Sequence, residues 1–392
     1  MADVLIVGSG LIGASIGLAL RGGADVVLHD RDVATAAQAI ARGAGRLWDG
    51  VERAQTVVVA VPPSRIASAL RSLQSHNIGR TYTHVASVQS QVQREVETLS
   101  CDVSTIVGGH PMAGRETSGP EGASADLFVG RTWAICPSSA SSAQALADVR
   151  DMAEGCGATV VELAALVHDA SVALLSHLPQ VAASALAGLL APTVAGHAQA
   201  GATRGVASQA AISDAEHGLG LALSGPGLVD TTRLAASDPT LWAEILVLNA
   251  AEVAPAVRRL ADSLGALADD LEGEEPHRDR FAAVLEFLLR GNRGRALVPV
   301  KRGEVSEAFG RVRVSVDDQP GRLAGLLTAA GDAGCNVEDV HVEHVPGRPQ
   351  GLIELVVETS VVGDLGDALR AGGWHVMGEL SPTHPPAGRQ HP

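Results

Sequence analysis

A glycine-rich turn close to the start of the chain constrains its fold more than any other feature. Four apolar residues, Val4 to Val7, precede the turn, which reads Gly8-Ser9-Gly10-Leu11-Ile12-Gly13. An apolar, helix-forming stretch from Ala14 to Leu20 follows it. Glycines in this G-x-G-x-x-G pattern allow a tight turn, a close approach of backbone to a ligand, and close packing of helix against strand. The order of strand, turn and helix predicts the first βαβ unit of a parallel α/β sheet.

The same turn predicts a dinucleotide site. The amino terminus of the helix offers free N–H groups and a partial positive charge, which suit a pyrophosphate. A second apolar run, Val26 to His29, ends at Asp30, about 20 residues after the first glycine, where an acid can accept hydrogen bonds from ribose hydroxyls. An acid also repels a 2′-phosphate, so we predict NAD, although Arg31 leaves NADP open. The predicted cofactor-binding residues are Gly8, Ser9, Gly10, Leu11, Ile12, Gly13 and Asp30.

Strands and helices alternate to about residue 160. The runs 56–61, 84–88, 103–107 and 132–136 have the composition of buried strands. We therefore predict a Rossmann-type doubly wound parallel sheet over residues 1–160. Residues 161–290 are rich in alanine and leucine and predict an all-helical domain for substrate binding and dimerisation. Residues 291–308 are expected to be a linker.

The C-terminal part predicts a separate small domain. Over residues 309–380, apolar alternation, a Pro-Gly turn and two short helical stretches give the order βαββαβ, which is a ferredoxin-like topology. Residues 381–392 are rich in proline and polar residues, and we expect them to be a disordered tail.

The composition limits what the protein can bind. The 392 residues contain 29 Lys and Arg against 44 Asp and Glu, a net charge of −15. Such an acidic chain is a poor partner for nucleic acid or an anionic membrane surface. Four scattered cysteines without a C-x-x-C pair predict neither a disulfide framework nor a zinc site. Prolines interrupt the apolar stretch 170–194 and no signal peptide is evident, so we expect a cytoplasmic protein without a membrane span.

A histidine in a glycine-rich segment is the first candidate catalytic residue. His110 follows Gly108-Gly109 and the apolar run 103–107, so we expect it just past the carboxyl end of a buried strand. Ligands of open α/β sheets bind outside these carboxyl ends. Pro111 biases His110 toward an extended backbone, which suits a general base aimed at a substrate. Taken alone such a histidine could simply cap a loop, but the dinucleotide turn favours the catalytic interpretation.

The helical region adds two polar groups. Pro179 should kink its helix beside His177 and turn this histidine toward a cleft, although a histidine tolerated on a helix is an equal alternative. Asp230 and Arg233 are three residues apart, so on a helix the carboxylate could orient the guanidinium for a substrate carboxylate. The alternative is an exposed ion pair, worth under about 1 kcal/mol.

Together these segments resemble the prephenate/arogenate dehydrogenase family of tyrosine biosynthesis. The resemblance covers about residues 1–300 and rests on GSGLIGAS, Val85-Ala86-Ser87-Val88, GGHPMAGRETSG, His168-Asp169 with SHLP, and DTTRLAASDPTLW. The segment Asp318-Gln319-Pro320-Gly321 is similar to an ACT domain, a module that binds an amino acid in related pathways. The chain departs from the family pattern at His84, where Asp is usual, and at Gln89, where Lys is usual.

The resemblance implies an activity and a set of roles. The activity is NAD-dependent oxidative decarboxylation of prephenate to 4-hydroxyphenylpyruvate. It implies that His110 takes the proton of the ring hydroxyl and that Ser87 hydrogen-bonds between His110 and the nicotinamide. The substrate-binding residues that it implies are Arg233, His177, Glu116, Asp230 and Trp242. It also implies feedback control by tyrosine at the ACT-like domain.

Three other functions stay open. Arogenate dehydrogenase uses the same chemistry on a substrate with an amino group in place of the keto group. A β-hydroxyacid dehydrogenase shares the dinucleotide turn but would be expected to use a lysine, and residues 100–275 contain none. A sensor that binds NAD and an amino acid without catalysis is favoured slightly by His84 and Gln89 and opposed by His110, Ser87 and Arg233.

Overall fold

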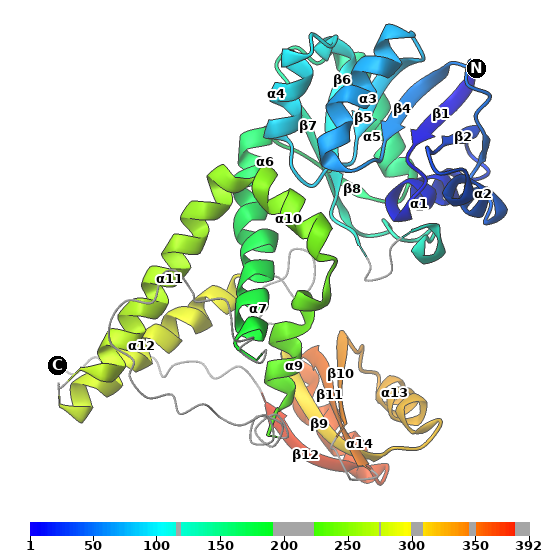
Figure 1. The fold of residues 1–392 in the computed structure, drawn as a ribbon. Coiled ribbons are helices and arrows are strands. Elements are labelled where there is room, and N and C mark those ends of the chain that lie inside the picture. The colour runs from blue at the N-terminus through cyan, green and yellow to red at the C-terminus, as the bar shows by residue number, and fades with distance from the viewer. Residues whose placement is uncertain (115–118, 191–222, 274–275, 299–308, 345–349, 381–392) are drawn as a thin grey trace, which may run out of the picture. The chain divides into compact units, whose positions relative to one another are not determined.

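The computed structural model describes residues 1–114, 119–190, 223–273, 276–298, 309–344 and 350–380 (Figure 1). The chain divides into two compact units, Met1–Asp262 and Ser263–Pro392. The domain boundaries expected at residues 160 and 290 are not tested by this division and stay predictions.

The first unit is built on an eight-stranded sheet in the order β3-β2-β1-β4-β5-β6-β7-β8. Its strands are β1 (Ala2–Val7), β2 (Val26–His29), β3 (Arg46–Leu47), β4 (Ala54–Val59), β5 (Gly79–His84), β6 (Ile106–Pro111), β7 (Thr132–Pro137) and β8 (Thr159–Glu162). The first six run parallel to one another, which confirms the Rossmann-type sheet.

Helices cover both faces of this sheet (Figure 1). Helices α1 (Leu11–Leu20), α2 (Val33–Ala41) and α5 (Ala143–Gly155) pack on one face, against side chains such as Ile6 and Val58. Helices α3 (Pro63–Ser75) and α4 (Ser90–Thr98) pack on the other, against Leu5 and Val57. Because successive residues of a strand point to opposite faces, strands buried on both sides require the continuous apolar runs seen in the sequence.

Strand β7 departs from the expected parallel sheet. It runs antiparallel to β6, with Pro111 opposite Trp133, and β8 then runs parallel to β7. The peptide N–H of Met112 donates to the carbonyl of Thr132 at 2.8 Å, so β7 begins beside the end of β6. Without a helical crossover to carry the chain back along the sheet, the returning strand must be antiparallel.

Two strand boundaries also differ from expectation. Strand β5 ends at His84, so Val85 to Val88 form a loop. Residues Val103–Thr105 form a 3₁₀ turn, capped by the Asp102 carboxylate, which accepts from the N–H of Ser104. This local hydrogen bond to the Asp102 carboxylate favours the turn over a strand. Strand β6 therefore starts at Ile106. His110 is the second-last residue of this strand and does not follow it, contrary to expectation.

The helical part of the first unit begins with one continuous rod. Helix α6 (Ala165–Val172) passes through a π-helical turn (Ala173–His177) into α7 (Leu178–Gly188). Pro179 has no N–H to donate, and the helix has a wider π-helical turn just before it, beside the place where a kink is expected. Next come α9 (Pro226–Thr232), a 3₁₀ turn (Arg233–Ala236), α10 (Pro239–Leu248), whose first turn is capped by Asp238, and α11 (Ala250–Glu272).

The rod Ala165–Gly188 is long and apolar enough, by length and composition, to cross a membrane, and the bent pair α10 and α11 passes the same test as one span. The rod nevertheless carries His168, Asp169 and His177, each at most 2% exposed. All three make hydrogen bonds to protein groups. Their burial among protein partners shows that one face of the rod packs against the rest of the first unit.

The second unit contains the end of α11, α12 (His277–Ala296) and a four-stranded antiparallel sheet. Its elements are β9 (Phe309–Asp317), α13 (Arg322–Asp332), β10 (Asp339–His344), β11 (Gln350–Glu358), α14 (Val362–Ala371) and β12 (His375–Leu380), in the sheet order β10-β11-β9-β12. This is the expected βαββαβ topology, with its own apolar core. Residues 291–296 continue α12 instead of starting a linker, helped by the ion pair of Arg293 with Glu286.

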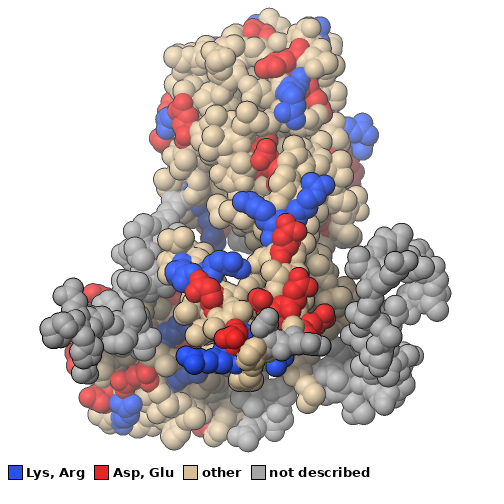
Figure 2. Space-filling model, turned by 90° about the vertical axis from the view of Figure 1, so that its left-hand side faces the viewer, with Lys and Arg blue, Asp and Glu red and all other residues tan. Residues whose placement is uncertain are grey.

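Charged side chains of both signs are interspersed on the face of the molecule in Figure 2, where the described residues form no large basic patch. This agrees with the acidic net charge. The four cysteines, Cys101, Cys136, Cys156 and Cys335, are buried and free.

Candidate active site

The dinucleotide turn joins β1 to α1 at the carboxyl edge of the sheet. Gly8 has a φ of +102°, and a Cβ there would collide with the carbonyl of Ala60. A Cβ on Gly13 would collide with the carbonyl of Gly8, so this glycine is required for packing α1 against the turn. A Cβ on Gly10, by contrast, would meet no protein atom within 4 Å. The turn is thus closed on its protein side and open where a pyrophosphate would approach.

Polar groups around the turn fit NAD. Asp30 accepts a hydrogen bond of 2.6 Å from the N–H of Ser9, which places the acid directly beside the turn. No side chain caps α1 at Gly10. The Ser9 hydroxyl is fully buried without a hydrogen-bond partner among the described residues. Ser9, the first N–H groups of α1 and Asp30 would hold the pyrophosphate and ribose of NAD.

His110 is the first member of a hydrogen-bonded row. Its Nδ1 lies 2.8 Å from Nε2 of His168, and Nδ1 of His168 lies 2.8 Å from Oδ1 of Asp169. The two imidazoles meet edge to face, with ring centroids 5.0 Å apart. The row connects β6 of the sheet to the first turns of α6. It has the form of a base oriented by a second group that is itself oriented by a carboxylate.

Asp169 of α6 is ionised, and its carboxylate faces the amino terminus of α4. Burial alone would raise its pKa, but hydrogen bonds from His168 and from the backbone N–H groups of Gln89 and Ser90 lower it below the usual value. Both N–H groups belong to the amino terminus of α4, which favours a negative charge. Since a carboxylate can only accept, Nδ1 of His168 must carry a proton.

His110 is a neutral imidazole at pH 7. Burial and, to a smaller extent, the neighbouring His168 and His177 lower the pKa of His110 to about 3. When Nδ1–H of His110 donates across the 2.8 Å contact, Nε2 of His168 accepts. The Nε2 atom of His110 then keeps its lone pair, so His110 can act as a general base at neutral pH.

Ser87 lies in the loop between β5 and α4 and is partly exposed. Among the described residues it makes no hydrogen bond to His110, whose Nδ1 is bonded to His168 instead. The role of Ser87 between His110 and the nicotinamide stays a prediction. The loop is nevertheless tied to β6, because the Gln89 amide donates to the carbonyls of both Ala86 and Gly109. Its place beside the carboxyl edge of the sheet is compatible with a cofactor contact.

His177 is 1% exposed, more deeply placed than expected. Its Nδ1 accepts from the Asn249 amide at 3.1 Å, which leaves Nε2–H as a donor. Burial lowers the pKa of His177 to about 4, so it too is neutral. The Trp242 ring meets it edge on, with centroids 5.9 Å apart. The Asn249 amide also donates to the backbone carbonyl of Asp169, linking His177 to the row.

Arg233 and Asp230 are both exposed, on either side of the junction where α9 ends and the 3₁₀ turn begins. The buried Gln180 of α7 donates to the carbonyl of Leu234 at 2.9 Å and so anchors the segment that carries Arg233. This places the arginine beside the rod that carries His177. Glu116 lies outside the described residues.

The comparisons with known proteins cover most of the chain. A model of the nucleotide-binding domain of prephenate dehydrogenase matches residues 16–162, and a model of its dimerization domain matches residues 164–287. A protein of Streptomyces niveus named "Probable prephenate dehydrogenase NovF" is 34% identical over 381 residues, which are 95% of this chain and 99% of that protein. The chain belongs to the prephenate dehydrogenase family.

Solved structures of this family share the fold. The Aquifex aeolicus prephenate dehydrogenase, in complex with hydroxyphenyl propionate and NAD+, matches with a TM-score of 0.62 at 24% identity. The match covers 75% of this chain and 97% of that chain. Synechocystis arogenate dehydrogenase matches with a TM-score of 0.59 at 24% identity, over 75% of this chain and 98% of that chain.

Sequence reasoning gave His168, Asp169 and Asn249 no role, although the structure joins them to His110 and His177. His168-Asp169 was visible as one of the segments that carry the family resemblance. Its function was hidden because about 58 positions separate His168 from His110, and no local pattern reports a contact across that distance. Asn249 carried no comparable signal.

Proposed function

We propose that this chain is an NAD-dependent prephenate dehydrogenase, which converts prephenate to 4-hydroxyphenylpyruvate and carbon dioxide. The observation that carries the proposal is the row His110–His168–Asp169 at the carboxyl edge of a sheet whose first turn fits NAD. Family membership supplies the substrate class. The fold alone would not, because sites rather than folds decide function.

In the proposed reaction, His110 acts at the ring hydroxyl. Bound NAD supplies the hydride acceptor. As the hydride leaves the ring carbon that bears the hydroxyl, Nε2 of His110 accepts the hydroxyl proton. The ring carboxylate then departs as carbon dioxide, its bonding electrons complete the aromatic ring, and the ring oxygen regains a proton. The transfer is favoured because aromatisation follows it.

His168 and Asp169 stabilise the protonated form of the base. When Nε2 of His110 takes a proton, Nδ1–H can pass its own proton to Nε2 of His168. The positive charge then lies on His168, 2.8 Å from the carboxylate of Asp169. Separating the charge from the substrate and pairing it with a carboxylate lowers the cost of protonating a buried imidazole.

We assign substrate carboxylate binding to Arg233, with Asp230 and Glu116 beside it, and a polar contact to His177, whose orientation Trp242 and Asn249 maintain. Guanidinium is suited to carboxylates because it offers two parallel donors. Ser87 is assigned to the nicotinamide.

The family match and the exposed apolar side chains of the rod, among them Leu166, Leu174 and Leu175, support a homodimer made through the helical region. We also propose that the enzyme acts in the cytoplasm. The βαββαβ domain supports the proposal that it is an ACT domain with tyrosine as its effector. If calorimetry detects no tyrosine binding and millimolar tyrosine leaves turnover unchanged, the effector assignment is wrong.

The function is tested by following NADH absorbance with purified protein, NAD and prephenate, and in parallel with arogenate and with NADP. Turnover with prephenate and NAD is expected. In His110→Asn, kcat should fall by a factor of about 10² or more. Higher kcat/KM for arogenate would make the chain an arogenate dehydrogenase. A folded protein inactive with every pair would favour the sensor.

A further inference from the structure

Gln89 connects the three segments that carry the catalytic groups. It is 2% exposed and lies at the start of α4. Its backbone N–H donates to Oδ1 of Asp169 at 2.8 Å. Its side-chain nitrogen donates to the carbonyl of Ala86 at 2.7 Å and to the carbonyl of Gly109 at 3.0 Å. Ala86 precedes Ser87, and Gly109 precedes His110.

The Gln89 side chain makes its hydrogen bonds just beyond the point where the pairing of β5 with β6 ends. The pairing of β5 with β6 ends at His84 and Gly108, so no strand of β5 continues beside Gly109. The two hydrogens of the Gln89 amide hold the backbone together beyond that point. A single NH₂ group bonded to two buried carbonyls fixes the loop and the strand relative to each other.

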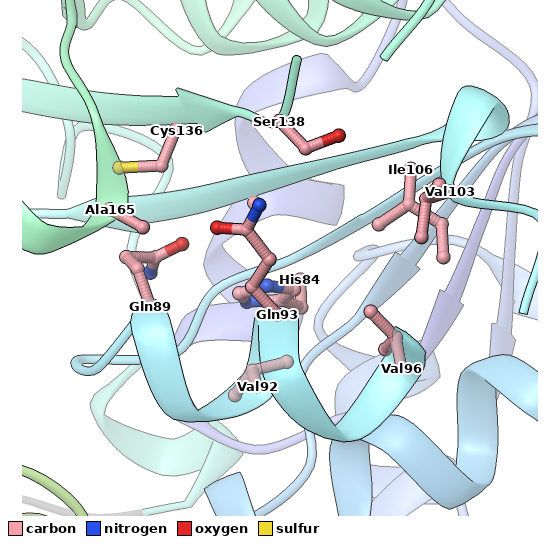
Figure 3. A pocket seen from close by; sticks show the side chains of 11 residues that line it. His84, Gln89, Val92, Gln93, Val96, Val103, Ile106, Cys136, Ser138 and Ala165 are labelled. Atoms are coloured by element: carbon pink, nitrogen blue, oxygen red, sulfur yellow. The ribbon is translucent and has the colours of Figure 1, made fainter. Parts of the chain in front are cut away.

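The orientation of the amide is determined by its surroundings. The side chain also lines a small cavity, whose polar lining includes His84, Gln93 and Ser138 (Figure 3). The amide oxygen has no hydrogen-bond partner among the described residues. Rotating the amide would place this oxygen against two carbonyl oxygens, which repel it. The side chain therefore gives up one acceptor bond to keep two donor bonds.

The glycines before His110 make room for this arrangement. A Cβ on Gly108 would collide with the amide oxygen of Gln89 and approach Nε2 of His84 to 3.0 Å. His84 in turn accepts from the N–H of Ala86 through Nδ1 at 3.3 Å, which steadies the same loop.

We infer that Gln89 is a positioning residue, which sets the place of His110 relative to Ser87 and Asp169 through hydrogen bonds to Ala86, Gly109 and Asp169. The inference rests on the proposed role of His110. Loss of the two side-chain bonds should therefore lower kcat strongly. It should change the KM for NAD less, because the dinucleotide turn belongs to other strands of the sheet.

The test compares Gln89→Met with Gln93→Met. Gln93 stands one turn later on α4 and lines the same cavity (Figure 3), but its side chain makes no hydrogen bond among the described residues. We expect kcat to fall about tenfold or more in Gln89→Met, because small displacements of a catalytic group are costly, and less than about twofold in Gln93→Met. The acid limb of the kcat/KM profile should move to higher pH only in Gln89→Met, as water reaches His110.

A rescue separates positioning from general stability. In His84→Asp/Gln89→Lys, an ammonium supplies donors to the same carbonyls and a nearby carboxylate balances its charge, so we expect kcat to recover most of the loss. Equal kcat in Gln89→Met and Gln93→Met, per folded molecule, would overturn the inference if His110→Asn is inactive. An active His110→Asn would instead overturn the catalytic assignment. If Gln89→Met does not fold, the isosteric Gln89→Glu takes its place, with the same expected loss.

Discussion

Asp169 sits at one end of a row of imidazoles, and its charge decides which nitrogen of His110 is free. As a carboxylate it accepts from His168, and this fixes the tautomer of each ring in turn. The same carboxylate accepts hydrogen bonds from two N–H groups at the start of α4, so one side chain links the row to that helix. A residue that touches neither substrate nor cofactor can therefore control the chemistry.

Asp169→Asn tests this control. The Asn amide can donate to Nδ1 of His168, which reverses both tautomers and leaves Nε2 of His110 protonated. We expect kcat to fall by a factor of about 10² to 10⁴, the range of general-base catalysis, with a smaller change in the KM for NAD. The melting temperature of the variant must be measured alongside. Retention of kcat within about threefold would show that tautomer control by Asp169 is unimportant.

Arg233→Ala tests substrate binding. Removing the guanidinium should raise the KM for prephenate more than about tenfold while the KM for NAD stays near its starting value, because the arginine is assigned to a substrate carboxylate. Arg150→Ala is the matched control, since Arg150 pairs with Glu162 on the edge strand β8. An unchanged KM for prephenate would remove Arg233 from the site.

At the scale of elements, the turn between β1 and α1 has glycines of two kinds. Gly13 has no room for a side chain because of the Gly8 carbonyl, whereas Gly10 faces open space. Gly10→Ala should therefore fold normally and raise the KM for NAD about tenfold or more, because its methyl group occupies the approach of the pyrophosphate.

Gly13→Ala should instead destabilise the protein by about 2 kcal/mol, since α1 must move away from the turn. The two variants are compared by thermal denaturation and by the KM for NAD. Equal loss of stability in both would contradict the division into a packing glycine and a ligand-facing glycine.

The elements also show which patterns a sequence reports reliably. Apolar runs and the glycine turn predicted the sheet and its cofactor edge, since burial on both faces demands continuous hydrophobicity. The direction of β7 and the π-helical turn before Pro179 left no comparable pattern. Each depends on contacts between segments that are far apart in the sequence, such as the pairing of Pro111 with Trp133.

For the whole molecule, buried neutral histidines couple stability to pH. Burial lowers the pKa of His84 to about 4 and that of His177 also to about 4. In the unfolded chain these groups titrate near 6.5, so below that pH the unfolded chain binds more protons. Their contribution is complete above pH 6.5 and is lost as the pH falls toward 4.

We expect His84 alone to reduce the free energy of unfolding by about 2 kcal/mol between pH 7 and pH 5. Urea denaturation at both pH values measures the change. His84→Asn should show a smaller difference between the two pH values, whereas the exposed His76→Asn should leave it unchanged. An unaltered difference in His84→Asn would show that this histidine does not carry the effect.

The sequence by itself determined the Rossmann-type sheet, the NAD site, the βαββαβ domain and His110 as the candidate base. Those features depend on residues close together in the chain, whose apolar periodicity and glycine spacing reflect local geometry. Only the tertiary structure decided that His110 pairs with His168 rather than Ser87, and that Gln89 joins three segments. These contacts connect residues far apart in the chain, and their geometry depends on how α4 and α6 pack against the end of the sheet.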